Sequence, residues 1–144
     1  MYFEEISLHL TRDVKPVVIE KEKMMAFARD YDPIPLHMDE EYARRTMFKG
    51  LIAPGVMSFM SMWASYLQDD IAGEQLLAGK STKIEWHKPV YPGDTLSGRL
   101  EVTGLTRRNA RNGIMETTMW VYNQHGDLVL TNVTESVVLC KPQE

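Results

Sequence analysis

An aspartate and a histidine stand five positions apart in the stretch RDYDPIPLHMDEEY, residues 29–42. A carboxylate and an imidazole that hold one water molecule can take a proton from it and deliver another proton nearby. That combination suits the addition of water across an activated double bond, or the reverse reaction. Asp32 and His37 are therefore the candidate catalytic pair, although an aspartate before a proline is also common in turns and a histidine near a helix start often has a structural role.

The link between these two residues decides whether their side chains can meet. Asp32 and Ile34 each precede a proline, which pushes both residues out of the α region and stiffens the link. If the link were fully extended, it would hold the two groups roughly 16 Å apart. We therefore expect the chain to bend at Leu36–His37, where it enters a helix capped by Asp39.

A second feature could stabilise the negative charge that develops on a carbonyl oxygen in such a reaction. The segment APGV places Gly55 at the start of an apolar helix, where free backbone N–H groups and the positive end of the helix dipole converge. Glycine also lets a ligand approach the backbone closely. Gly55 is thus a candidate oxyanion site, although a glycine after Pro54 is by itself only a helix-start signal.

Helical patterns dominate the first half of the chain and would position these groups. Residues 20–30 have the apolar spacing of a short helix. Residues 39–48 predict a second helix, because Asp39 suits the N-cap position and acidic residues precede basic ones along it. From Gly55 to Leu67 the chain is apolar nearly all round, which predicts a helix buried in the middle of the protein.

Strand patterns dominate the second half of the chain. Four segments with β-type sequences are separated by turn residues, and residues 12–19 suggest a short strand or an extended arm, in which Pro16 favours an edge position. Successive strands with short turns form an antiparallel sheet. The sequence therefore predicts a single α+β domain, residues 1–144, in which a long antiparallel sheet wraps around the central helix. The predicted strands are residues 12–19, 81–90, 94–106, 113–124 and 127–139.

Composition excludes several classes of function. The chain has 144 residues and a formal net charge of −4, which lacks the basic footprint of a nucleic-acid-binding protein. No apolar run reaches membrane-spanning length, and acidic residues stand where a signal peptide would carry basic ones. The single cysteine, Cys140, cannot form an internal disulfide. We expect a cytoplasmic protein without nucleic-acid or membrane partners.

Other chemical motifs do not fit. The stretch GEQLLAGKS, residues 73–81, resembles a phosphate-binding loop, but it has one residue too many between its glycines and a strand follows it. No Gly-x-Ser-x-Gly elbow is present for a hydrolase serine. The histidines and the cysteine lack metal-ligand spacing, so we predict no metal site. His87 could contact a ligand, but a histidine at a strand end is more often solvated.

The two candidate segments together resemble the MaoC-like dehydratase family, which includes the R-specific enoyl-CoA hydratases. The first segment is FARDYDPIPLHMD, residues 27–39, which has the Asp-x(3)-Leu-His-x-Asp core of that family. The second is FKGLIAPGVM, residues 48–57, which is similar to the glycine segment of the family. The later stretches HKPVYPGDTLSGRLEV and VYNQHGDLVL are similar to its strand pattern, so the resemblance covers nearly the whole chain.

This resemblance implies a fold and an activity. The fold would be a hotdog fold, a long helix wrapped by an antiparallel sheet, paired into a homodimer with a continuous sheet. The activity would be that of an enoyl-CoA hydratase-type lyase, which adds water to a 2-enoyl-CoA to give a 3-hydroxyacyl-CoA, or catalyses the reverse. Asp32 and His37 would activate the water, and the Gly55 amide would hold the thioester carbonyl.

The resemblance also implies how the substrate lies. The acyl group would run along the buried helix, and coenzyme A would lie at the dimer surface. We expect Pro54, Val56 and Ser58 to contact the substrate beside Gly55. No cofactor is implied other than coenzyme A as part of the substrate. The candidates for binding its phosphates are Lys80, Lys83, Lys88, Arg107, Arg108 and Arg111.

Departures from the family pattern leave two alternatives open. Tyr31 replaces the usual glycine, Ile34 the usual asparagine, and Pro54 the histidine before the key glycine. A non-catalytic subunit that binds acyl-CoA would fit these changes. An acyl-CoA thioesterase is the other alternative, because hotdog thioesterases also place a carboxylate near a helix-start amide. The spacing of the aspartate and the histidine favours the hydratase.

Overall fold

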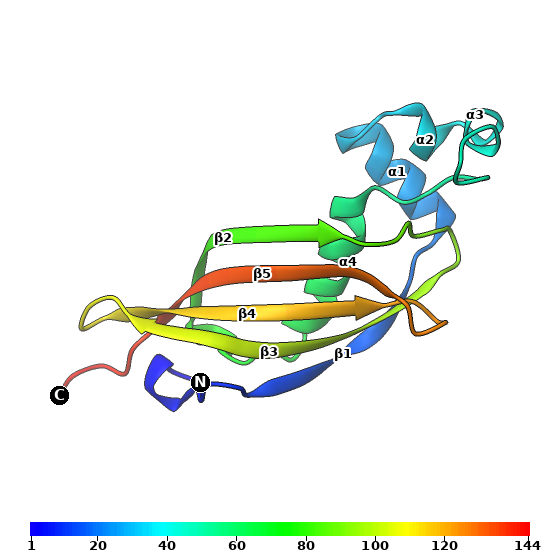
Figure 1. Cartoon of the computed structure of the whole chain (residues 1–144). Coiled ribbons are helices and arrows are strands. Elements are labelled where there is room, and N and C mark those ends of the chain that lie inside the picture. Colours follow the sequence, from blue (N-terminus) through cyan, green and yellow to red (C-terminus); the bar gives the residue numbers. More distant parts are fainter.

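Five strands form one antiparallel sheet in the computed structural model, which describes all 144 residues (Figure 1). They are β1 (Thr11–Val18), β2 (Leu76–Trp86), β3 (Thr95–Arg107), β4 (Asn112–Tyr122) and β5 (Leu128–Leu139). Their order across the sheet is β1-β3-β4-β5-β2, so the first two strands of the chain form the two edges. The register of β1 shifts around Pro16, which confirms the predicted edge strand.

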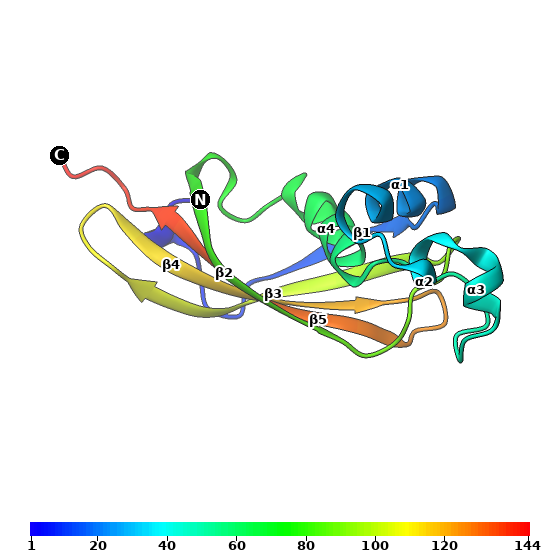
Figure 2. The ribbon, with the colours of Figure 1, turned by 90° about the horizontal axis from the view of Figure 1, so that it is seen from above.

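The helices lie on one face of this sheet (Figure 2). They are α1 (Lys21–Tyr31), α2 (Pro35–Met38), α3 (Glu40–Arg44) and α4 (Gly55–Leu67), with short 3₁₀ turns η1 (Phe3–Glu5) and η2 (Gly73–Gln75). The helix α4 packs across the sheet, whereas α1, α2 and α3 stand together at one end of it, beyond the edge formed by β2 (Figure 1). We call α1–α3 the helical lobe. None of the helices is long and apolar enough to cross a membrane.

The central helix α4 spans the predicted residues and carries the core. Met57, Met62 and Tyr66 are buried and pack in one cluster with the inward side chains of the sheet. This arrangement confirms the predicted α+β architecture of a sheet around a central helix. One side of α4 remains uncovered, because four apolar residues at helical spacing along it stay partly exposed. This apolar stripe consists of Val56, Met60, Trp63 and Leu67.

The predicted boundaries hold for β3, β4 and β5 to within two residues, but those of β2 were wrong at both ends. The strand begins at Leu76, and Gly79 and Ser81 pair with β5, which confirms that GEQLLAGKS is not a phosphate-binding loop. It ends at Trp86 rather than at residue 90. Pro89 explains the early end, because proline cannot donate to a strand ladder.

Candidate active site

The link between the two catalytic candidates makes a tight turn. Asp32 follows the last residue of α1, and its φ of −153° lies outside the α region, as expected before a proline. The Ile34 N–H donates to the Asp32 carbonyl oxygen at 2.8 Å and closes the chain around Pro33. Helix α2 then starts at Pro35, a favoured first helical residue. The chain does bend at Leu36–His37, which lie inside α2, but the turn around Pro33 comes earlier and was not predicted.

This turn brings the two side chains into contact. The Oδ2 atom of Asp32 lies 3.2 Å from Nε2 of His37. The other ring nitrogen, Nδ1, lies 2.7 Å from the carbonyl oxygen of Ile52. A carbonyl oxygen can only accept, so Nδ1 carries a hydrogen. Nε2 therefore faces the Asp32 carboxylate across this contact.

The two groups of the pair have different exposures, which suits different tasks. The His37 side chain is 7% exposed, whereas that of Asp32 is 44% exposed. Burial and the bond to Ile52 fix the orientation of the imidazole ring. The carboxylate can still reach water.

The segment before α4 holds the carbonyl group of Ile52 in place. The Ala53 N–H donates to the Val90 carbonyl oxygen at 2.7 Å, and the Tyr91 hydroxyl donates to the Phe48 carbonyl oxygen at 2.8 Å. These bonds tie the segment to the chain that leaves β2. The orientation of His37 therefore depends on residues far from it in the sequence.

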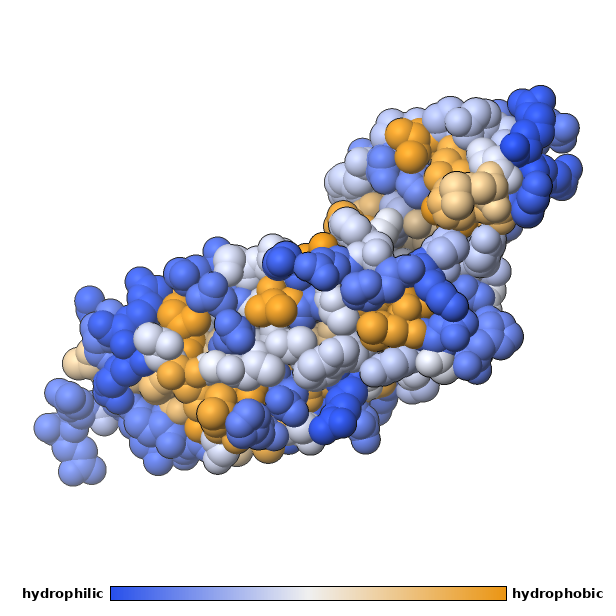
Figure 3. Space-filling view, viewed as in Figure 1, coloured by the Kyte–Doolittle hydropathy of each residue, from blue (hydrophilic) through white to orange (hydrophobic).

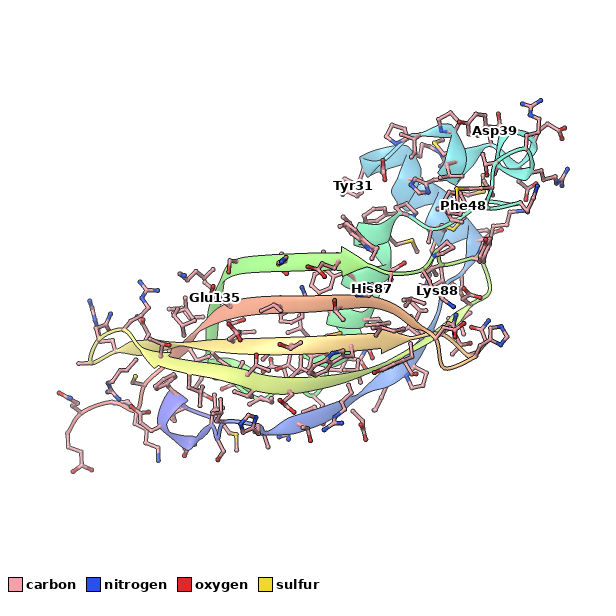
Figure 4. The ribbon with its side chains drawn as sticks, in the orientation of Figure 1. Tyr31, Asp39, Phe48, His87, Lys88 and Glu135 are labelled. Atoms are coloured by element: carbon pink, nitrogen blue, oxygen red, sulfur yellow. The ribbon has the colours of Figure 1, made fainter.

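A pocket of about 440 Å³ lies where the helical lobe meets the sheet. Its walls come from three places: Asp32 and His37 in the lobe, the first turn of α4 with the segment before it, and residues 86–90. Figure 3 shows the lobe projecting from the body of the sheet, and Figure 4 shows Phe48, His87 and Lys88 around this junction.

The start of α4 supplies unpaired amides to the pocket. The first bond along the helix runs from the Ser58 N–H to the Pro54 carbonyl oxygen, at 3.2 Å. The N–H groups of Gly55, Val56 and Met57 have no partner in the protein. Because Gly55 and Val56 line the pocket, their amides are the donors available to an oxygen atom bound there.

Trp86 packs against Gly55, a contact that sequence reasoning missed. A Cβ atom at Gly55 would collide with the indole, lying 2.9 Å from its Cζ2 atom and closer still to Nε1 and Cε2. The indole therefore occupies the space beside Gly55 that we expect a ligand to need, and a larger residue at this position would displace the ring. The only sign of this contact in the sequence was Trp86 itself, a large aromatic residue near the end of a predicted strand and three positions before Pro89.

Four of the other predicted site residues lie together in the pocket wall: Asp32, His37, Val56 and Ser58. Pro54 does not. It is buried, its carbonyl oxygen accepts the Ser58 N–H, and it does not line the pocket. Pro54 therefore starts the helix, and the structure gives no support for its predicted substrate contact.

The residues that depart from the family pattern in the link lie outside the pocket. Tyr31 is 75% exposed and Ile34 is 45% exposed, and neither lines the wall. Figure 4 shows Tyr31 at the end of α1. Asp39 is also outside the wall, and its carboxylate accepts the Tyr42 N–H at 3.1 Å as the predicted cap of α3. That helix ends at Arg44, so its predicted extent to residue 48 was wrong.

Of the six basic residues considered for phosphate binding, only Lys88 lines the pocket. Lys88 forms an ion pair with Asp127 at 3.2 Å, and the neighbouring His87 bonds through Nε2 to the Thr131 hydroxyl at 2.9 Å. Arg107 and residues 108–111 lie at the opposite end of the sheet, in the β3–β4 hairpin (Figure 1).

Comparison with known proteins identifies the family. The family model described as "MaoC like domain" matches residues 7–123. This chain belongs to the MaoC-like domain family. A solved MaoC-like dehydratase from Rhodospirillum rubrum superposes with a TM-score of 0.89 at 28% identity and covers 99% of each chain. This match confirms the hotdog fold.

Curated MaoC-like relatives include enzymes. The (R)-specific enoyl-CoA hydratase of Rhodospirillum rubrum is 28% identical over 104 residues, which are 72% of this chain and 71% of that protein. An uncharacterized protein of Bacillus subtilis, YdeM, is 29% identical over 125 residues, which are 86% of this chain and 89% of that protein. The chain is thus related to the hydratases and dehydratases of the family.

Proposed function

We propose that this protein is an acyl-thioester hydratase, which adds water to a 2-enoyl-CoA to give a 3-hydroxyacyl-CoA, or catalyses the reverse. The observation that carries the proposal is the 3.2 Å contact between Asp32 Oδ2 and His37 Nε2 in a pocket that is also lined by Gly55, the first residue of α4. The names of the related hydratases support the same reaction.

In the proposed mechanism, the two groups of the pair have separate tasks. The Asp32 carboxylate takes a proton from a water molecule, whose oxygen bonds to C3 of the enoyl group. The double-bond electrons move toward the thioester carbonyl oxygen, where the Gly55 N–H stabilises the charge. His37 Nε2 then gives its proton to C2. A proton transfer from Asp32 to His37 across their contact restores the starting state, and dehydration runs these steps backward.

Two other functions use the same fold, and one comparison of products separates all three. Purified protein is mixed with 2-enoyl-CoA thioesters of short, medium and long acyl chain. A hydratase removes the absorbance of the conjugated enoyl thioester and releases no thiol. A thioesterase releases free coenzyme A thiol. A non-catalytic acyl-CoA-binding subunit binds the thioester and does neither. We expect the first result, and either of the others would overturn the proposal.

We also propose that the chain works as a homodimer in the cytoplasm. Its free sheet edges differ, because β1 carries Pro16 and a register shift near its middle, whereas β2 has no proline. The register shifts of β2 lie before Ser81, and from Ser81 to Trp86 it pairs with β5 without a break. A continuous edge segment of this kind can pair with a second copy and extend the sheet. The apolar stripe on α4 is uncovered in one chain, and a partner copy would bury it.

This pairing predicts a mass of twice the 16.6 kDa of one chain by light scattering. Met60 is 46% exposed on the stripe, and Met60→Glu would place a charge there, so we expect this variant to run as a monomer. Met47→Glu introduces the same change at an 84% exposed position outside the stripe and should stay dimeric. A monomeric native protein, or a dimeric Met60→Glu variant, would contradict the pairing.

A further inference from the structure

The first turn of α4 carries a hydroxyl group that nothing in the protein uses. Ser58 Oγ is fully buried and has no hydrogen-bond partner. The other two serines of the helix each donate to a carbonyl oxygen at 2.8 Å, Ser61 to that of Met57 and Ser65 to that of Lys15. A buried hydroxyl without a partner destabilises the folded state, so its presence calls for a physical reason.

Local geometry places this hydroxyl beside the unpaired amides. A helical serine commonly bonds the carbonyl oxygen four residues back, as Ser61 does, but the Ser58 hydroxyl makes no such bond to Pro54. Side chains on a helix lean toward its N-terminus, so the Ser58 hydroxyl lies along the first turn. Gly55, three residues earlier, is on the same side of the helix, and both residues line the pocket.

We infer that Ser58 is a second hydrogen-bond donor to the thioester carbonyl oxygen, beside the Gly55 amide. This inference rests on the proposed function and assigns Ser58 a specific atom of the substrate. Two donors match an oxygen that has two lone pairs and gains negative charge as the enolate forms. Asp32 and His37 then activate the water molecule and carry out the proton transfers.

The wall of the pocket must open slightly for this contact. Because Ser58 has no exposed surface, a carbonyl oxygen reaches its hydroxyl only when a covering side chain moves. Trp86 is 50% exposed and packs against the same turn at Gly55, so its indole has room to swing outward. The thioester group would take the space that the ring leaves.

The test compares two ligands that differ only at the carbonyl group. A saturated acyl-CoA thioester and the matching S-alkyl-CoA thioether, which lacks the carbonyl oxygen, are titrated by calorimetry into native protein and Ser58→Ala. We expect Ser58→Ala to bind the thioester roughly tenfold more weakly and the thioether with unchanged affinity. For hydration, we expect kcat to fall about 10²-fold.

Two further variants control for a structural effect. Thr117→Val removes another buried hydroxyl without a partner, on β4 and outside the pocket wall, and should change neither affinity nor kcat. Ser58→Cys keeps a weak donor of similar size and should give intermediate affinity for the thioester, which serves if Ser58→Ala fails to fold.

The outcomes separate this inference from the proposed reaction. An equal loss of affinity for both ligands, or no loss for either, would overturn the role of Ser58. Loss confined to the thioester supports that role even if the native protein hydrates no enoyl-CoA. In that case the proposed reaction fails while the carbonyl contact stands.

Discussion

At the scale of single residues, one hydrogen atom organises the proposed chemistry. The Ile52 carbonyl oxygen holds a hydrogen on Nδ1 of His37, which directs Nε2 toward Asp32. If the ring were free to turn, either nitrogen could face the carboxylate and the pair would lose its defined geometry. The backbone of a segment that is remote in sequence therefore contributes to the site without contacting the substrate.

The sequence predicted the members of this pair but not what orients them. Residue types and spacing identified Asp32 and His37, since a proline-rich link limits the available conformations. The bond from His37 to Ile52 spans 15 positions and depends on how the segment before α4 packs. Nothing in the local sequence specifies that packing. The lone hydroxyl of Ser58 was equally invisible, because an absent partner can be recognised only in three dimensions.

At the scale of elements, the contact between β2 and α4 predicts the sign of the change in stability when Gly55 is replaced by alanine. Alanine is ordinarily preferred to glycine in a helix by about 0.5–1 kcal/mol. Gly55→Ala should instead destabilise the protein by about 1–3 kcal/mol, because the added Cβ displaces the Trp86 indole from its packing on α4. The free energy of unfolding in urea measures this difference.

Two variants complete that experiment. Gly55→Ala combined with Trp86→Leu should recover much of the lost stability, because the smaller side chain relieves the collision. Gly50→Ala, where no atom lies within 4 Å of the new Cβ, should have little effect. If Gly55→Ala is stabilising, the packing of the indole on α4 is wrong.

The elements themselves were predictable to different degrees. The helix from Gly55 to Leu67 and the strands β3, β4 and β5 have strong apolar patterns that tertiary packing did not override. The short helix α2 was missed, because a four-residue turn between prolines has no periodicity to detect. The start of β2 was missed because LLAGKS is exposed and carries glycine, and its strand pairing is set by β5.

At the scale of the whole molecule, the N-terminal turn η1 contacts the chain that leaves β5, at the end of the sheet away from the pocket (Figure 1). The Glu4 carboxylate accepts the Lys141 N–H at 3.0 Å and the Arg107 guanidinium at 3.1 Å. Phe3 packs against Gly113 on β4. The N-terminal segment therefore closes the end of the sheet opposite the helical lobe, and its stability should not affect the catalytic pair.

This contact predicts a pH-dependent stability. Hydrogen bonds from the Lys141 N–H, above all, and from the N–H of Glu4 itself lower the pKa of the Glu4 carboxyl from 4.5 to about 2. Because the folded-state pKa is lowered, the ionised carboxylate contributes stability above pH 4.5, and this contribution is lost as the pH falls toward 2. Glu4→Gln should therefore lower Tm at pH 7, and the difference from native protein should shrink across that range.

A matched substitution tests whether the effect belongs to this carboxylate. Glu74→Gln changes a glutamate without an ion pair or side-chain hydrogen bond, so its Tm should follow that of native protein at every pH. A constant difference between Glu4→Gln and native protein from pH 7 to pH 2 would show that the carboxylate is not the source of the effect.

The most direct test of the proposed hydratase is the initial rate of hydration of its best 2-enoyl-CoA by three proteins. Asp32→Asn removes the base of the pair at a partly exposed position, so we expect the rate to fall about 10²–10⁴-fold with little change in Tm. Asp30→Asn makes the same change two residues away, outside the pocket wall, and should keep the full rate. A full rate for Asp32→Asn would contradict the catalytic role of the pair.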